Sequence, residues 1–169
     1  MAEALSGKIV AQTALRLTNA LDMSTPKDNL MRQQSCDIQS GGGQNQMNKL
    51  WHDSRLLGPG SHDNLGLVSS LQDAFGQTVN FAAVKYVNIR VSDLTSGSLV
   101  FCNSVAARFG GIVSLGATLG QGGWHQYLWP SSAGWVVTSG SNSTIRISGN
   151  TDIPSGQTLA YDIMIGGYG

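Results

Sequence analysis

The chain has 169 residues, a length typical of a single domain and sufficient to bury a full hydrophobic core. Its formal net charge is zero, and charged residues make up 12% of it, against about 25% in an ordinary soluble domain. The chain therefore lacks the excess of positive charge that binds phosphates, and nucleic acid is not expected as a direct partner. A net charge near zero favours association instead. Composition alone leaves open an extracellular β domain with a Ser/Thr/Gly-rich surface and a subunit of a symmetric shell or tube.

The N-terminal part is less regular than the rest. Residues 8–21 place apolar or small side chains opposite polar ones, which favours a strand, with a short amphipathic helix as the alternative. Residues 24–29 are typical of a turn, and residues 33–39 can form an edge strand that ends at the glycine run of residues 40–43. We expect residues 1–46 to form an arm with the first strands, able to reach neighbouring subunits.

The middle of the chain contains the one helix signal. Residues 47–57 predict a strand that ends at the Gly-Pro-Gly turn of residues 58–60. Ser70 to Asp73 resembles a capping box, and Gly76 suits the left-handed position at which a helix ends. These signals predict one short helix near residues 70–75.

The second half of the chain consists of short strand patterns between Gly- and Ser-rich turns. In residues 85–91 apolar side chains stand at 87, 89 and 91, and in residues 159–165 they fall at every second position, which gives each strand one buried face. With these two included, strands are expected at residues 78–81, 84–91, 98–103, 111–119, 125–129, 135–139, 144–148 and 157–165.

This pattern predicts an all-β, single-domain fold in which residues 47–169 form the body, as a β-sandwich, a jelly roll or a closed barrel. We favour the sandwich or jelly roll. The expected core residues are Ile89, Val91, Phe101, Val113, Leu115, Ile145, Ile147, Tyr161 and Ile163.

Cys36 and Cys102 form neither a disulfide framework nor a zinc pattern, because no second Cys or His is suitably spaced. Each lies in a strand-like segment, where buried free thiols are common, and one disulfide between them is the alternative. Residues 1–8 contain no apolar run and no segment approaches the length of a membrane span, so we expect synthesis in the cytoplasm, without a signal peptide or a membrane partner.

The best candidate for a metal site is the pair of dipeptides His52-Asp53 and His62-Asp63. Neighbouring residues on a strand point to opposite faces, so His52 and Asp53 are poorly placed to bind one ion. His62-Asp63 is expected in a turn, where Asp commonly hydrogen-bonds its own backbone. We therefore expect no metal ligands.

No other pattern predicts catalysis or a cofactor. The chain has no GxSxG nucleophile elbow, and its ten acidic residues are spread thinly. Residues 120–123 are glycine-rich, but no helix pattern follows them, so a phosphate-binding loop is not expected. We predict a protein that is not an enzyme, with no catalytic or cofactor-binding residues.

Four aromatic residues, Trp124, Tyr127, Trp129 and Trp135, are clustered in the sequence. Large rings build the cores of sandwiches, and they also supply interface contacts or platforms on which sugars stack. Core packing is the main interpretation, and a subunit interface or sugar-stacking site is the functional alternative.

A family likeness spans residues 47–167, and the segments that carry it share no catalytic residues. They are Leu65-Gly66-Leu67, Ser70-Leu71-Gln72-Asp73-Ala74-Phe75-Gly76, Val79-Asn80-Phe81-Ala82-Ala83-Val84-Lys85 and Tyr161-Asp162-Ile163-Met164-Ile165-Gly166, with Trp51, Asp53 and Arg55. Together they resemble small structural proteins of tailed bacteriophages. The resemblance implies an all-β virion component that decorates the capsid or contributes to the tail.

From this resemblance we expect a capsid decoration, or cement, protein located in the virion. Its partners would be the major capsid protein or other virion subunits, and it would form a homo-oligomer, for which a trimer is one option. The alternative is a carbohydrate- or receptor-binding module of a tail or head fibre, using the four aromatic residues.

Overall fold

The computed structural model describes residues 4–18, 27–92, 96–101 and 117–169, which form thirteen β-strands and no helix. The strands are β1 (Gly7–Thr18), β2 (Lys27–Ile38), β3 (Lys49–Leu57), β4 (His62–Gly66), β5 (Leu71–Gln72), β6 (Thr78–Val79), β7 (Ala83–Val91), β8 (Ser98–Phe101), β9 (Ala117–Gly120), β10 (Trp124–Leu128), β11 (Trp135–Val136), β12 (Thr144–Gly149) and β13 (Leu159–Tyr168).

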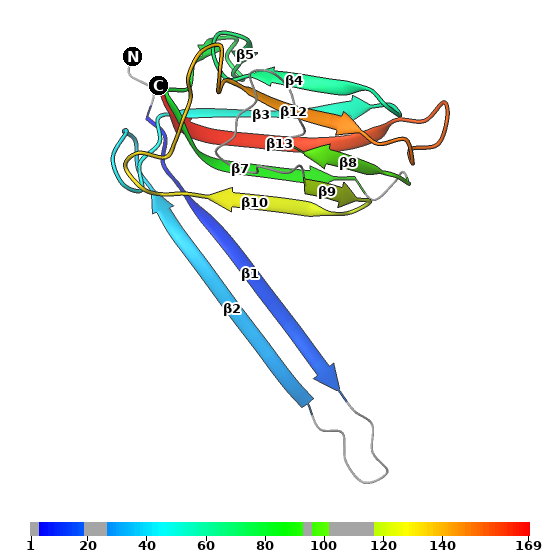
Figure 1. Ribbon diagram of the computed structural model, residues 1–169. Coiled ribbons are helices and arrows are strands. Elements are labelled where there is room, and N and C mark those ends of the chain that lie inside the picture. The colour runs from blue at the N-terminus through cyan, green and yellow to red at the C-terminus, as the bar shows by residue number, and fades with distance from the viewer. Residues whose placement is uncertain (1–3, 19–26, 93–95, 102–116) are drawn as a thin grey trace.

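Two antiparallel sheets form the body (Figure 1). The first has the order β10-β7-β13-β3, with the short β11 also paired to β7, and the second has the order β4-β12-β8-β9. One core cluster contains buried side chains from both sheets, including Ile89 and Ile163 from the first and Phe101 and Ile147 from the second. The predicted all-β, sandwich-like single domain is therefore confirmed.

The core follows the period-2 patterns of the sequence. Along β12, Ile145 and Ile147 are buried between partly exposed neighbours, as expected for a strand with one face on a core. The predicted core residues that the structure describes are all buried: Ile89, Val91, Phe101, Ile145, Ile147, Tyr161 and Ile163. Val113, Leu115 and Cys102 lie outside the described residues.

The helix predicted near residues 70–75 is wrong. This segment instead forms a small hairpin in which Leu71 pairs with Val79, and both side chains are buried in the core. Asp73 stabilises the connecting loop, because its Oδ1 accepts hydrogen bonds from the backbone N–H of Phe75 (2.9 Å) and of Gln77 (2.8 Å). Gly76 does adopt a left-handed conformation, with φ of 76°, but within a hairpin loop.

Among the described strands, β1 and β2 pair only with each other and form a long hairpin, from Gly7 opposite Ile38 to Thr18 opposite Lys27. We call this hairpin the arm. It projects away from the body (Figure 1). The strand predicted at residues 8–21 is confirmed over the described part, whereas residues 27–29 belong to β2 and not to the predicted turn.

The base of the arm is fixed to the body by a second apolar cluster. Ile38, Met47 and Tyr86 are buried there, and the partly buried Leu5 and Ile9 pack against them. Tyr86 belongs to β7, so this cluster joins the arm to the first sheet of the sandwich.

A buried lysine completes the attachment. The Lys85 ammonium donates hydrogen bonds to the backbone carbonyl oxygens of Gly42 (2.9 Å), Gly43 (2.6 Å) and Gln46 (3.0 Å), in the loop that follows the arm. Lys85 has no exposed surface, and burial lowers the pKa of its ammonium group. The ammonium is thus satisfied by the loop that it organises.

Candidate functional site

The four clustered aromatic residues do not form one surface. Trp124 and Tyr127 lie on β10 three positions apart, so their side chains point to opposite faces of the strand. Trp124 is 56% exposed on the outer face of the sheet. Tyr127 packs against the core, where its ring stacks with Phe101 at a centroid distance of 6.0 Å.

The other two rings contact each other. Trp129 and Trp135 meet edge to face, with ring centroids 5.4 Å apart and an interplanar angle of 89°. Trp135 packs against the core, whereas Trp129 is 47% exposed. The exposed rings among the four are therefore those of Trp124 and Trp129, which are separated along the chain and do not belong to one contact pair.

The outer face of the first sheet brings Trp124 into a row of polar side chains. The register places Trp124 opposite Arg90, Arg90 opposite Asp162, and Asp162 opposite Ser54. Directly opposed residues of neighbouring antiparallel strands share a face of the sheet. One row of four side chains therefore crosses β10, β7, β13 and β3.

The adjacent row consists of Gln126, Asn88, Met164 and His52. The amide groups of Gln126 and Asn88 each donate a hydrogen bond to the Tyr86 hydroxyl oxygen at 3.2 Å. This pair of bonds fixes the orientation of both amides.

An open groove of about 350 Å³ lies along these two rows, on the outer face over β7, β13 and β3. Its walls include His52, Ser54, Tyr86, Asn88, Arg90 and Asp162. The Ser54 hydroxyl donates a hydrogen bond to Asp162 Oδ1 at 2.6 Å. Within the described residues, the side chains of Arg90 and His52 make no hydrogen bond or ion pair.

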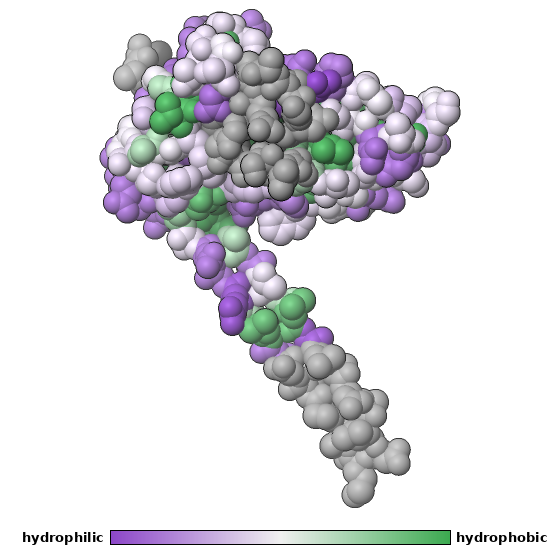
Figure 2. Space-filling model, viewed as in Figure 1, coloured by the Kyte–Doolittle hydropathy of each residue, from purple (hydrophilic) through white to green (hydrophobic). Residues whose placement is uncertain are grey.

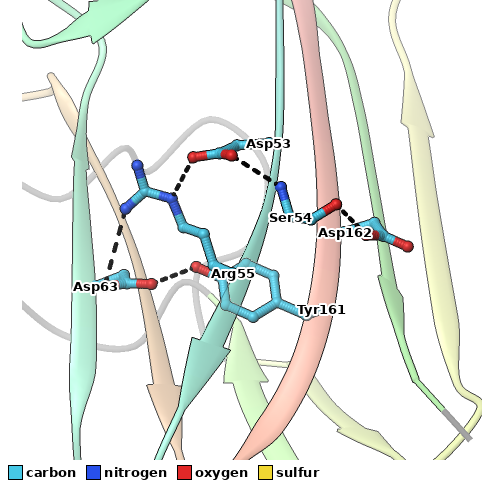
Figure 3. Close-up of polar contacts among 6 residues, drawn as sticks. All are labelled: Asp53, Ser54, Arg55, Asp63, Tyr161 and Asp162. Atoms are coloured by element: carbon cyan, nitrogen blue, oxygen red, sulfur yellow. Dashed lines mark hydrogen bonds and ion pairs between the residues drawn. The ribbon is translucent and has the colours of Figure 1, made fainter.

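A second polar cluster lies on the inner side of β3 and β13 (Figure 3). The buried Tyr161 hydroxyl donates a hydrogen bond to Asp63 Oδ2 at 2.6 Å. Arg55 is placed between two carboxylates, with Nε 2.9 Å from Asp53 Oδ2 and a terminal nitrogen 3.9 Å from Asp63 Oδ1. Asp63 is on β4, so the cluster connects the two sheets.

The chemistry of this cluster is that of a structural contact. Burial raises the pKa of the Tyr161 phenol well above its ordinary value of 10.0, and the hydrogen bond to Asp63 adds to the effect. The phenol therefore stays protonated and remains a hydrogen-bond donor. The Arg55 guanidinium balances the negative charges of the Asp53 and Asp63 carboxylates.

The structure separates the two His-Asp pairs. His62 and Asp63 lie in β4, so the prediction that they occupy a turn is wrong. His52 points to the outer groove, whereas Asp53 contacts Arg55 on the inner side. In the described part of the chain, no three His, Cys, Asp or Glu side chains are grouped so as to hold a metal ion. Cys36 is a free thiol with its Sγ 3.4 Å from Asn45 Oδ1.

The sequence interpretation missed the groove and the role of Lys85. Lys85 is in phase with Val87, Ile89 and Val91, so a buried lysine that requires partners was detectable from the strand pattern. The groove residues come from separate strands, and only their register assembles them.

In the described residues, no helix is long and apolar enough to cross a membrane. The chain matches no protein-family model, no curated protein and no solved structure.

Proposed function

We propose that the chain is a non-enzymatic structural subunit of a virion, namely a capsid decoration or cement protein that stabilises a bacteriophage head through contacts between subunits. The observation that carries this proposal is the arm. It is attached to the body at its base, yet its distal part has large apolar side chains that are 44–72% exposed, and no described residue of the body covers them.

These side chains lie on both faces of the hairpin. Leu15 and Leu30 are directly paired, 62% and 44% exposed, and Met31 is 72% exposed on the opposite face. Figure 2 shows the resulting apolar surface on the arm, away from the body. A two-stranded hairpin with no further packing is only marginally stable in water. Contact with a neighbouring subunit would cover these side chains and stabilise the hairpin.

The order of the strands supports the same proposal by analogy. Without the arm, the β5–β6 hairpin and β11, the described part of the body has eight strands. Numbered along the chain, they form the orders 6-3-8-1 and 2-7-4-5. We propose that the body is a jelly roll, for which this order is characteristic. Jelly rolls occur in viral capsids and also in lectins, so the likeness concerns architecture alone.

The proposed partners are the major capsid protein or other virion subunits, together with further copies of this chain, for which a trimer is one arrangement. The zero net charge is compatible with close packing, because it removes long-range repulsion between subunits.

The experiment is to locate the chain in intact particles by cryo-electron microscopy and to delete the arm by joining residues 7 and 38 through a short Gly-Ser linker. We expect the arm to cross onto another subunit. The deletion variant should keep the circular dichroism of a β protein but be absent from purified particles.

The opposite result is equally informative. If residues 4–18 and 27–38 contact no neighbouring subunit while Trp124 and Trp129 face solvent, the cement proposal is wrong. A carbohydrate- or receptor-binding module of a fibre would then take its place.

A further inference from the structure

We propose that the groove on the outer face of the first sheet binds a neutral oligosaccharide that lies across the strands, with one sugar ring over β13 and the next on Trp124. This inference goes beyond the proposed virion role and does not depend on it. It rests on the register of four strands and on the side chains that this register brings together.

The polar groups of the groove match the hydroxyl groups of a sugar. Asp162 uses Oδ1 for the Ser54 hydroxyl, which leaves Oδ2 as an acceptor. Arg90, directly opposite Asp162, has donors that no described residue occupies. Neighbouring sugar hydroxyls both donate and accept, so a carboxylate beside a guanidinium can bind two of them with charge-assisted hydrogen bonds.

The amide of Asn88 adds a further polar group with a fixed orientation. Its Nδ2 donates to the Tyr86 hydroxyl, so its carbonyl oxygen is held in one direction by that bond. The Tyr86 hydroxyl also accepts from Gln126. These groups are positioned before any ligand arrives, which reduces the entropy lost on binding.

Trp124 supplies an apolar surface at the end of the same row. The C–H face of a pyranose ring is apolar, and an exposed indole offers a flat surface for it. Trp124 and Asp162 are two strands apart, and neighbouring strands are separated by about 4.8 Å. The resulting separation of about 10 Å is close to the end-to-end length of a disaccharide, so a hydroxyl at one end can bind Asp162 while the ring at the other end lies on Trp124.

Charge and shape favour a neutral sugar over other ligands. The groove combines the acidic Asp162 with the basic Arg90, so it has no excess of positive charge for a phosphate or a polyanion. Its volume of about 350 Å³ is at the lower end for ligand sites, and it lies open on a sheet face. A short, hydrated and extended ligand fits this geometry.

The test is saturation-transfer NMR on the full chain with cellobiose, maltose, lactose and glucose, followed by calorimetric titration of the sugars that bind. We expect saturation transfer to at least one disaccharide and weaker binding of glucose. Asp162→Asn should weaken both mono- and disaccharide binding about tenfold, the loss of one charge-assisted hydrogen bond. Trp124→Ala should reduce disaccharide affinity to that of glucose.

The matched controls are Trp129→Ala, an exposed indole outside the groove, and Asp37→Asn, an exposed carboxylate on the arm. Both should bind sugar within twofold of the original chain. The inference is overturned if no disaccharide binds, or if the controls weaken binding as much as Asp162→Asn and Trp124→Ala do. Binding of 3′-sialyllactose without any neutral sugar would overturn the assigned class. A lower oligomeric state of Trp124→Ala in sedimentation, without sugar binding, would identify the face as a subunit interface instead.

Discussion

The ammonium nitrogen of Lys85 lies 2.6 Å from the carbonyl oxygen of Gly43, and this bond joins a core strand to the loop from which the arm emerges. β7 and β13 change register next to this position, between Gly166 and Gly167, so Lys85 occupies a β-bulge. A bulge changes the direction of the side chain at its position, and this one directs the Lys85 side chain toward the loop. This buried cation therefore fixes the arm to the body together with the apolar cluster at the base of the arm.

Replacing Lys85 tests how much this cation contributes to the stability of the attachment. Lys85→Met keeps the apolar stem but leaves the carbonyls of Gly42, Gly43 and Gln46 without their donor, so we expect a loss of about 2–3 kcal/mol in the free energy of unfolding. Urea denaturation measures the loss, and hydrogen exchange should increase at residues 41–46 in particular. Lys49→Met, a lysine at the start of β3, should change stability by less than about 0.5 kcal/mol. Equal losses in the two variants would contradict the assigned role.

The Tyr161–Asp63 hydrogen bond predicts a specific pH dependence. Because the pKa of Tyr161 is raised by folding, its contribution to stability is complete below pH 10. Above that pH the unfolded chain loses the phenol proton while the folded chain keeps it, so stability falls. We expect the difference in unfolding free energy between the original chain and Tyr161→Phe to shrink by about 1 kcal/mol from pH 10 to 11.

Urea denaturation between pH 8 and 11 measures this difference. The lowered pKa of Lys85 has the opposite effect in alkaline solution, since it raises stability with pH, but both chains contain Lys85 and the comparison removes it. A difference that stays constant from pH 9 to 11 would show that Tyr161 ionises in the folded chain as readily as in the unfolded one.

Ile163 and Met164 are adjacent on β13 but face opposite sides of the sheet, 2% and 39% exposed. Ile163→Ala should therefore cost about 2–5 kcal/mol, from the lost burial and the cavity that it leaves. Met164→Ala should cost less than about 1 kcal/mol. Denaturation of the two variants tests whether β13 has the register described, since a shift by one residue would reverse the two results.

Local patterns in the sequence predicted most strands, because the alternation around Ile89 and Ile163 depends only on near neighbours. The prediction of a short helix near residues 70–75 was wrong because it also used local patterns alone. Asp accepts backbone hydrogen bonds and Gly adopts a left-handed conformation both at helix ends and in hairpin loops, so Asp73 and Gly76 are compatible with either structure. The pairing of Leu71 with Val79 makes this segment a hairpin.

Long-range pairing also explains why the residues of the candidate site could not be predicted from the sequence. The row from Trp124 to Ser54 joins strands separated by up to 108 positions along the chain, between Ser54 and Asp162. No local pattern specifies that register. The strand phase of β10 did contain one usable signal, since Trp124 and Tyr127 cannot share a face of one regular strand.

Gly76 offers a separate test of the hairpin loop. Its φ of 76° is costly for residues with a Cβ, although an added Cβ would meet no atom within 4 Å. Gly76→Ala should therefore cost about 1 kcal/mol through backbone conformation alone. Gly120→Ala, where the Cβ also meets nothing and φ is not left-handed, should be neutral within about 0.5 kcal/mol. Thermal unfolding of both variants gives the comparison, and equal stabilities would contradict the left-handed loop.

The arm provides the test that links the fold to assembly, because its two faces can be changed separately. Leu15 shares one face with Leu30, and Met31 lies on the other. Leu15→Ser and Met31→Ser should leave the unfolding free energy of the isolated chain within about 0.5 kcal/mol, since both side chains are exposed there. If a neighbour covers them, each change should weaken assembly by about 1.5–3 kcal/mol, the value of a buried apolar side chain.

Sedimentation of the purified chain and its binding to particles that lack it measure this effect. Leu56→Ser is the control, because Leu56 is equally exposed at 66% but lies on the body. A loss confined to Leu15→Ser would show that one face of the arm lies on a neighbour, and losses in both arm variants would show an arm inserted between two neighbours. Assembly unchanged in both, with Leu56→Ser defective, would place the interface on the body and remove the arm from the mechanism.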